Sequence, residues 1–214
     1  NSHFSLITSS YKHLTIEETN QWEYVYPKVV YNIDDLKLEL IDGDFSLLNN
    51  FTFQKNLNDS YHTTIASKLN WNLNKIDNSS GLVFNNESFI KVVSLSEDNK
   101  NFKDNDTIRF YPQLSSKITY PLFNETKSTN QTLTPIVMPI LAPYNNYSEH
   151  ESITNSNIFS ANRSSSIIKS ESGPRINYGL EWFMEYKNDF DIKITTGQSL
   201  RFNKRKEDII NNFI

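Results

Sequence analysis

The chain has 214 residues, of which 37% are hydrophobic and 13% are aromatic, and its formal net charge is −4. An acidic balance without a long basic run argues against a nucleic-acid partner, because phosphate backbones are bound by clustered lysine and arginine. The sequence has no cysteine, which excludes disulfides and thiolate metal sites within it. Many aromatic residues in a chain with few other apolar residues predict a thin apolar band rather than a large packed core.

Strand patterns account for most of the first 122 residues. Residues 22–33 are aromatic and β-branched, as is typical of strands. Residues 35–53 predict a hairpin, because leucines alternate along one face before the turn-forming pair Asp42-Gly43. Alternating apolar and polar residues predict further strands at 68–76, 88–96 and 107–122. No segment shows the periodicity of a helix. The sequence also has no run of about 18 apolar residues, which a transmembrane helix would need.

A proline-rich apolar stretch and a polar segment follow. Residues 132–146 are the most apolar part of the chain and contain Pro135, Pro139 and Pro143. Proline cannot donate a hydrogen bond to a neighbouring strand, so this stretch predicts an irregular or edge strand. Residues 145–172 are polar, rich in serine and asparagine, and without any period. They predict a long loop, and loops of this length often carry function.

The next two segments predict an antiparallel hairpin. Residues 175–187 alternate strictly, which is a strand signal because successive side chains point to opposite faces. Residues 190–202 alternate in the same way, and Asn188-Asp189 between them suits a tight turn. In 175–187 one face is apolar, and we predict that it faces lipid; it consists of Ile176, Tyr178, Leu180, Trp182 and Met184. The other face is polar and includes Arg175, Asn177 and Glu181.

These elements predict an all-β fold with an antiparallel up-and-down sheet. In a β-sandwich the apolar face packs on a dry core, whereas in an outer-membrane barrel it faces lipid and the polar face lines the lumen. A membrane strand needs about 9–11 residues, against about 5–6 in most globular sheets. The length of 175–187 therefore suits the barrel. The pattern alone leaves several functional classes open, among them a soluble β-sandwich adhesin, a sugar-binding module and a general porin.

Residues 109–202 resemble the barrel domain of the LptD/OstA family of lipopolysaccharide-assembly outer-membrane proteins, with the most specific motifs in 157–182 and 195–202. The family pattern is matched at Asn157, Phe159, Asn162, Arg163, Glu171, Gly173, Arg175, Asn177, Tyr178, Gly179 and Leu180. One strand later it is matched again at Gly197, Gln198, Ser199 and Arg201. The sequence departs from the family at Ser166, Ile168, Lys169 and Leu200.

The resemblance implies a segment of a transmembrane β-barrel in the cell outer membrane: an incomplete barrel with an open, curved sheet, to which residues 1–214 all belong. It implies delivery of lipopolysaccharide to the outer leaflet. The implied partners are lipopolysaccharide, outer-membrane lipid, an LptE-type plug lipoprotein, and a periplasmic bridge protein that binds an N-terminal domain outside this sequence. Such transport makes and breaks no bond in this segment, so we expect no enzyme activity, catalytic residue or cofactor.

The resemblance also implies a lumen-side network between the long loop and the strands. The expected members are Asn157, Phe159, Asn162, Arg163, Lys169, Glu171, Arg175, Asn177, Glu181, Gln198 and Arg201. We expect the loop to fold inward with Phe159 as an apolar anchor, where Gly173 and Gly179 leave room for it. The cluster Glu149, His150 and Glu151 is not expected to bind a metal, because adjacent side chains on an extended chain point apart.

Overall fold

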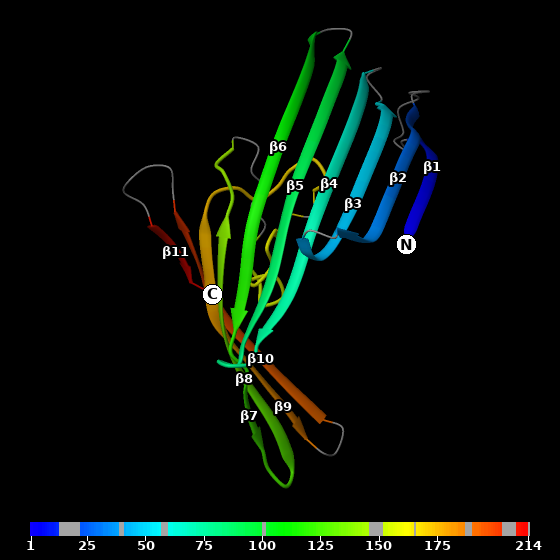
Figure 1. The fold of residues 1–214 in the computed structure, drawn as a ribbon. Helices are drawn as coiled ribbons and strands as arrows, with labels where there is room; N and C mark the ends of the chain where they lie inside the picture. Colours follow the sequence, from blue (N-terminus) through cyan, green and yellow to red (C-terminus); the bar gives the residue numbers. More distant parts are fainter. Residues whose placement is uncertain are drawn as a thin grey trace. The chain divides into compact units, whose positions relative to one another are not determined.

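The computed structural model describes residues 1–12, 22–38, 41–56, 60–99, 102–145, 152–164, 166–186, 190–202 and 209–213. Within these ranges every regular element is a β-strand (Figure 1). The strands are β1 (Ser2–Lys12), β2 (Trp22–Leu38), β3 (Ile41–Lys55), β4 (Tyr61–Asp77), β5 (Leu82–Asn99), β6 (Phe102–Thr119), β7 (Leu122–Glu125), β8 (Thr129–Leu141), β9 (Arg175–Tyr186), β10 (Phe190–Phe202) and β11 (Ile209–Phe213). Among the described residues, no helix is long and apolar enough to span a membrane.

The strands follow one another through a single sheet. Their order is β1-β2-β3-β4-β5-β6-β8-β9-β10-β11, and β7 pairs with β8 beside this path (Figure 1). Every pair whose register is described is antiparallel. β1 and β11 are the two ends of the order, so the sheet is open. The prediction of an all-β, antiparallel, incomplete up-and-down barrel is confirmed.

The chain divides into two compact units, residues 1–70 with 89–111, and residues 71–88 with 112–214. In the first unit the ladders are irregular, with one register shift between β1 and β2 and three between β2 and β3. A row of ring contacts, with centroids 5.4 to 6.3 Å apart, runs across β2, β3 and β4 through Tyr24, Tyr26, Phe53 and Tyr61. The candidate site described below lies wholly in the second unit.

The predicted turn at Asp42-Gly43 is wrong, because both residues lie inside β3. Gly43 has a φ of 116°. The register of β2 with β3 shifts on both sides of Leu36, close to this position. A bulge in a strand demands unusual backbone angles, and glycine adopts positive φ without a Cβ clash. The Asp-Gly pair therefore marks a bulge, and its turn-like composition misled the prediction.

β8 is irregular, as predicted, but it is not an edge strand. It pairs with β9 without interruption from Thr129 to Ile140. On its other side the ladder changes from β7 to β6, and Pro135 and Pro139 fall in the gaps of that ladder. Proline has no N–H to donate, so the gaps leave no hydrogen bond unmade. The carbonyl of Pro135 still accepts a hydrogen bond from the amide of Tyr120 at 3.2 Å.

β9 and β10 form the predicted hairpin. Tyr186 pairs with Phe190, and their ring centroids lie 5.7 Å apart. Pairing then continues without a register shift to Arg175 and Arg201. The turn at Asn188-Asp189 belongs to the part of the chain that the structure does not describe. Because side chains alternate along a strand, the five predicted lipid-facing residues share one face of β9. One of the five, Met184, is buried, with an exposed fraction of 8%.

Candidate functional site: a strap clamped to β8, β9 and β10

Residues 142–174 connect β8 to β9, and residues 152–174 of this connection contain no strand in their described part; we call residues 152–174 the strap. The strap lies against one face of the hairpin. A Cβ added at Gly179 would be 2.9 Å from the ring of Phe159, and one added at Gly197 would be 3.0 Å from it. Ala161 of the strap packs against Met138 and Ile140 of β8. We call this side of β8, β9 and β10 the strap-covered face.

The glycines create the seat for the Phe159 ring. Gly179 and Gly197 are direct partners across the β9–β10 ladder, so two adjacent positions on the strap-covered face lack side chains. The ring fills that space, which any larger residue would occupy itself. From the other side, Nζ of Lys117 lies 5.5 Å from the ring centroid and makes a cation–π contact. The structure thus places Phe159 where the sequence predicted an apolar anchor.

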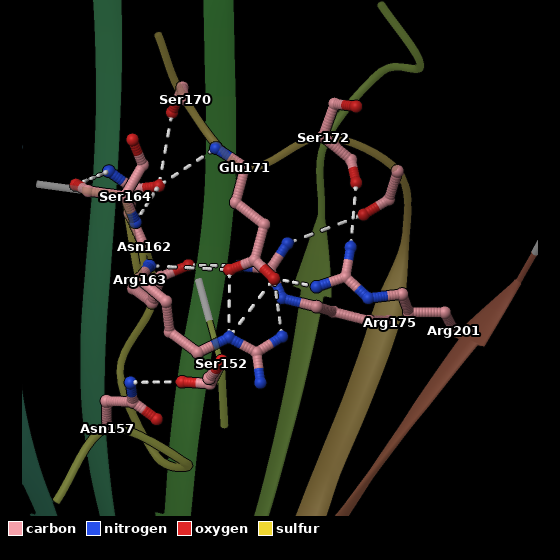
Figure 2. Close-up of polar contacts among 12 residues, drawn as sticks. Ser152, Asn157, Asn162, Arg163, Ser164, Ser170, Glu171, Ser172, Arg175 and Arg201 are labelled. Carbon is pink, nitrogen blue, oxygen red and sulfur yellow. Dashed lines mark hydrogen bonds and ion pairs between the residues drawn. The ribbon is translucent and has the colours of Figure 1, made fainter. Parts of the chain in front are cut away.

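Glu171 is the centre of a buried charged cluster (Figure 2). Its carboxylate accepts hydrogen bonds at 3.1 Å from Nε of Arg163 and at 2.5 Å from Nη2 of Arg163. Nη2 of Arg175, at the start of β9, lies 3.0 Å from Oε2. Arg201 of β10 forms a third ion pair with the same carboxylate. One carboxylate therefore joins guanidinium groups from the strap and from two strands.

The cluster is almost completely removed from water. The side chains of Glu171, Arg163 and Arg175 are 0% exposed, and that of Arg201 is 18% exposed. Burial lowers the pKa of Arg163 to about 10, so this guanidinium is still a cation at neutral pH. In such surroundings, charge-assisted hydrogen bonds are stronger than at an exposed surface, and losing one partner is correspondingly costly.

Hydrogen bonds within the strap hold Glu171 in position (Figure 2). Oδ1 of Asn162 accepts a hydrogen bond from the amide of Glu171 at 3.0 Å and one from the hydroxyl of Ser170 at 3.3 Å. The backbone carbonyl of Ala161 accepts hydrogen bonds from side chains of two strands, from Nη2 of Arg175 in β9 and from Nε2 of Gln113 in β6 at 2.7 Å. The strap is therefore attached through both its side chains and its main chain.

The two ends of the connection meet at a narrow neck beside the end of β10. The amide of Gly173 donates to the carbonyl of Pro143 at 3.2 Å, and the amide of Phe202 donates to that of Pro174 at 3.1 Å. The hydroxyl of Tyr144 donates to the carbonyl of Phe202. Gly173 has a φ of 84°, and a Cβ there would be 3.0 Å from the ring of Tyr144. Glycine is required at this position for both reasons.

Three of the predicted network residues lie elsewhere. Asn157 makes a local turn, donating to the carbonyl of Ser152 at 2.9 Å. Glu181 pairs with Lys193 at 3.6 Å instead of with the cluster. Gln198 is a correction: it is the ladder partner of Tyr178, whose hydroxyl donates to its Oε1, so it lies on the opposite face.

Sequence reasoning missed several contributors to the site. Alternation along β10 puts Ser199, which is 1% exposed, on the strap-covered face, and this signal was present in the sequence. Gln113, Met138 and Ile140 come from strands far away in the sequence, and no local pattern marks them. Asn177 was predicted and is found on this face, with 0% exposure.

The arrangement suits binding and clamping rather than catalysis. The Glu171 carboxylate is held by guanidinium groups, which do not act as bases at neutral pH. In the described ranges, no group of three or more histidine, cysteine, aspartate or glutamate residues is placed to bind a metal ion. The Glu149–Glu151 segment considered in the sequence analysis is not among those ranges.

On the opposite face of the same strands, large apolar side chains are exposed. Val137 of β8 is 47% exposed, its ladder partner Tyr178 of β9 is 37% exposed, and Ile194 of β10 is 51% exposed. Leu141 at the end of β8 is 60% exposed. A water-soluble protein buries apolar side chains and exposes charges, whereas this part of the sheet does the reverse.

Comparison with protein families matches residues 3–212 to one family, described as LPS transport system D. A search among curated proteins finds no match. The family match spans nearly the whole chain and includes β8, β9, β10 and the strap. The chain therefore belongs to the LPS transport system D (LptD) family, whose members take part in lipopolysaccharide transport and assembly at the outer membrane.

Proposed function

We propose that this chain forms part of the barrel wall through which lipopolysaccharide is delivered to the outer leaflet of the cell outer membrane. The strap-covered face lines the lumen, and the opposite face contacts the acyl chains of lipid. The observation that carries this orientation is the inverted distribution of side chains: Glu171 of the strap and Arg175 of β9 are buried on the strap-covered face, whereas Val137 and Ile194 are exposed on the opposite face. Lipid stabilises exposed apolar side chains, and a protein-lined lumen accommodates charged ones.

The strap supplies a fixed surface on the lumen side. While the strap is seated it is held by Glu171, by the Phe159 ring and by the neck at Gly173, so in this state its outward side chains keep a constant position. Ile167 is one of these, with an exposure of 39%. A plug lipoprotein of the LptE type needs such a rigid seat, because ordering a mobile loop on binding costs conformational entropy.

This chain performs no bond-making or bond-breaking step in the proposed function. The partners in this proposal are lipopolysaccharide, the plug lipoprotein, outer-membrane lipid and a periplasmic bridge protein. The buried cluster supports a binding role without a chemical step, because Glu171 and its three arginines hold the strap and present no nucleophile beside a free base.

Photo-crosslinking in cells that depend on the full-length protein tests the orientation. A photo-reactive amino acid at Val137 should capture lipid, and one at Ile167 should capture the plug lipoprotein or lipopolysaccharide. Both positions are exposed to similar degrees, so each serves as the control for the other. Capture of a protein partner at Val137, or capture of membrane phospholipid alone at Ile167, would contradict the proposed orientation.

A further inference from the structure

Four side chains of the hairpin form a compact square beneath the strap, which we call the floor. Arg175 pairs with Arg201, and Asn177 pairs with Ser199, in the β9–β10 ladder. Residues two positions apart on a strand point to the same face, so all four side chains point toward the strap. Arg175, Asn177 and Ser199 are at most 1% exposed.

The strap forms ion pairs with one half of the floor, Arg175 and Arg201, but offers no hydrogen bond to the other half, Asn177 and Ser199. Glu171 forms ion pairs with Arg175 and with Arg201. In this arginine half, Nε of Arg175 is buried without a hydrogen-bond partner among the described residues. In the other half, Oδ1 and Nδ2 of Asn177 and Oγ of Ser199 all lack one, so no polar side-chain atom of that half is satisfied there. Buried polar atoms are nearly always hydrogen-bonded in folded proteins, because an unmade bond leaves the loss of hydration uncompensated.

The side chains that the strap places nearest to this half are apolar. A Cβ at Gly197 would be 3.1 Å from Cδ1 of Ile158 and 3.0 Å from the Phe159 ring, and Gly197 is two positions from Ser199. A strap that served only as a permanent brace would be expected to offer polar atoms to Asn177 and Ser199. The mismatch indicates that this half of the floor has a second partner.

We propose that the strap is a removable cover, and that the floor binds a phosphate group carried on a hydroxyl-rich sugar when the strap lifts. While the strap is seated, the carboxylate of Glu171 substitutes for the ligand, because it pairs with the guanidinium groups that bind the phosphate once the strap has lifted. The assignment of lipopolysaccharide as the source of this phosphate rests on the proposed function.

The chemistry of the floor fits this ligand. Arginine presents a planar fork of donors that binds phosphate oxygens in pairs, and Arg175 and Arg201 lie side by side across the ladder. The amide of Asn177 both donates and accepts hydrogen bonds, as does the hydroxyl of Ser199, which matches the hydroxyl groups of a sugar. A phosphate competes well with Glu171 because it carries more oxygens and up to twice the charge.

Hydrogen exchange of the strap amides, in the full-length protein with its partners in lipid bilayers, tests the proposal. The variant Ser199→Ala removes a hydroxyl that is unsatisfied only while the strap is seated. We therefore expect strap exchange to slow by roughly tenfold, the effect of relieving one buried unsatisfied group. Thr196→Ala, which removes an exposed hydroxyl from the opposite face of the same strand, should leave strap exchange unchanged. Asn177→Leu is a second variant and should also slow exchange.

Three additions to the wild-type protein identify the ligand: lipopolysaccharide, dephosphorylated lipopolysaccharide and inorganic phosphate. Intact lipopolysaccharide should accelerate strap exchange several-fold, and the dephosphorylated form should not. Acceleration by inorganic phosphate without any effect of lipopolysaccharide would support the floor as a phosphate site and contradict the proposed function. Faster or unchanged exchange in both Ser199→Ala and Asn177→Leu, or equal effects of the two lipopolysaccharide forms, would overturn the inference.

Discussion

Replacing Glu171 with glutamine isolates the charge at the centre of the strap. Glutamine has almost the same shape, so the packing around position 171 is retained. The substitution removes the negative charge shared by Arg163, Arg175 and Arg201, and it turns one acceptor oxygen into an N–H donor facing other donors. Buried guanidinium groups are then left without their counter-ion.

The expected cost follows from burial. Removing one partner of a buried ion pair costs about 3–5 kcal/mol, because the remaining charge stays desolvated. The matched control is Glu181→Gln in β9, whose partner Lys193 lies 3.6 Å away; the side chains of Lys193 and Glu181 are 60% and 26% exposed. An exposed pair of this kind contributes about 0–1 kcal/mol. The two variants change the same atoms and should differ by about 3 kcal/mol.

Hydrogen exchange of the strap amides measures this difference directly, since it reports the free energy of local opening. We expect Glu171→Gln to accelerate exchange more than about hundredfold, the factor that corresponds to 3 kcal/mol, and to leave β2–β3 exchange unchanged. Lipopolysaccharide delivery should fall in the same variant, because the seat of the plug lipoprotein is disturbed. Equal strap exchange in Glu171→Gln and Glu181→Gln would refute the view that this carboxylate holds the strap.

Two further substitutions test the neck and the lipid-facing side. Gly173→Ala forces a side chain into a φ of 84° and against the Tyr144 ring, so it should cost about 1–3 kcal/mol and raise exchange at residues 172–174; unchanged exchange there would contradict the role of the neck. Leu180→Arg should lower the free energy of unfolding from lipid bilayers by about 2–4 kcal/mol if position 180 lies near the bilayer midplane, whereas Leu180→Met should not; equal stability of the two variants would contradict contact with lipid.

Local patterns in the sequence were sufficient for the strands and for which residues share a face. Strict alternation in 175–187 and 190–202 predicted the β9–β10 hairpin, including the pairing of Tyr186 with Phe190. This succeeds because the two-residue period of a strand is a property of the backbone and does not depend on distant contacts. The same alternation should have selected Ser199 in place of Gln198 for the strap-covered face.

Composition was a weaker guide where one residue type suits two structures. Asp42-Gly43 has the composition of a tight turn, yet Gly43 serves a bulge within β3. Proline in β8 predicted an irregular or edge strand; the strand is irregular, but it is paired on both sides, and Pro135 and Pro139 lie at gaps in one of its ladders. In both cases the sequence showed that the residue needs a special backbone position. Whether that position is a turn, a bulge or a gap in a ladder depends on the neighbouring strands.

How the charged side chains of the strap meet those of the strands was decided by the tertiary structure. The sequence predicted the strap's length, its polarity and most of its charged residues, but no period relates Arg163, Glu171 and Arg201 to one another. Their meeting requires the chain to pass the neck at Gly173 and β10 to be paired with β9, because only then does Arg201 stand beside Arg175. Side chains without a repeating pattern are placed by the path of the backbone, and contacts between distant segments determine that path.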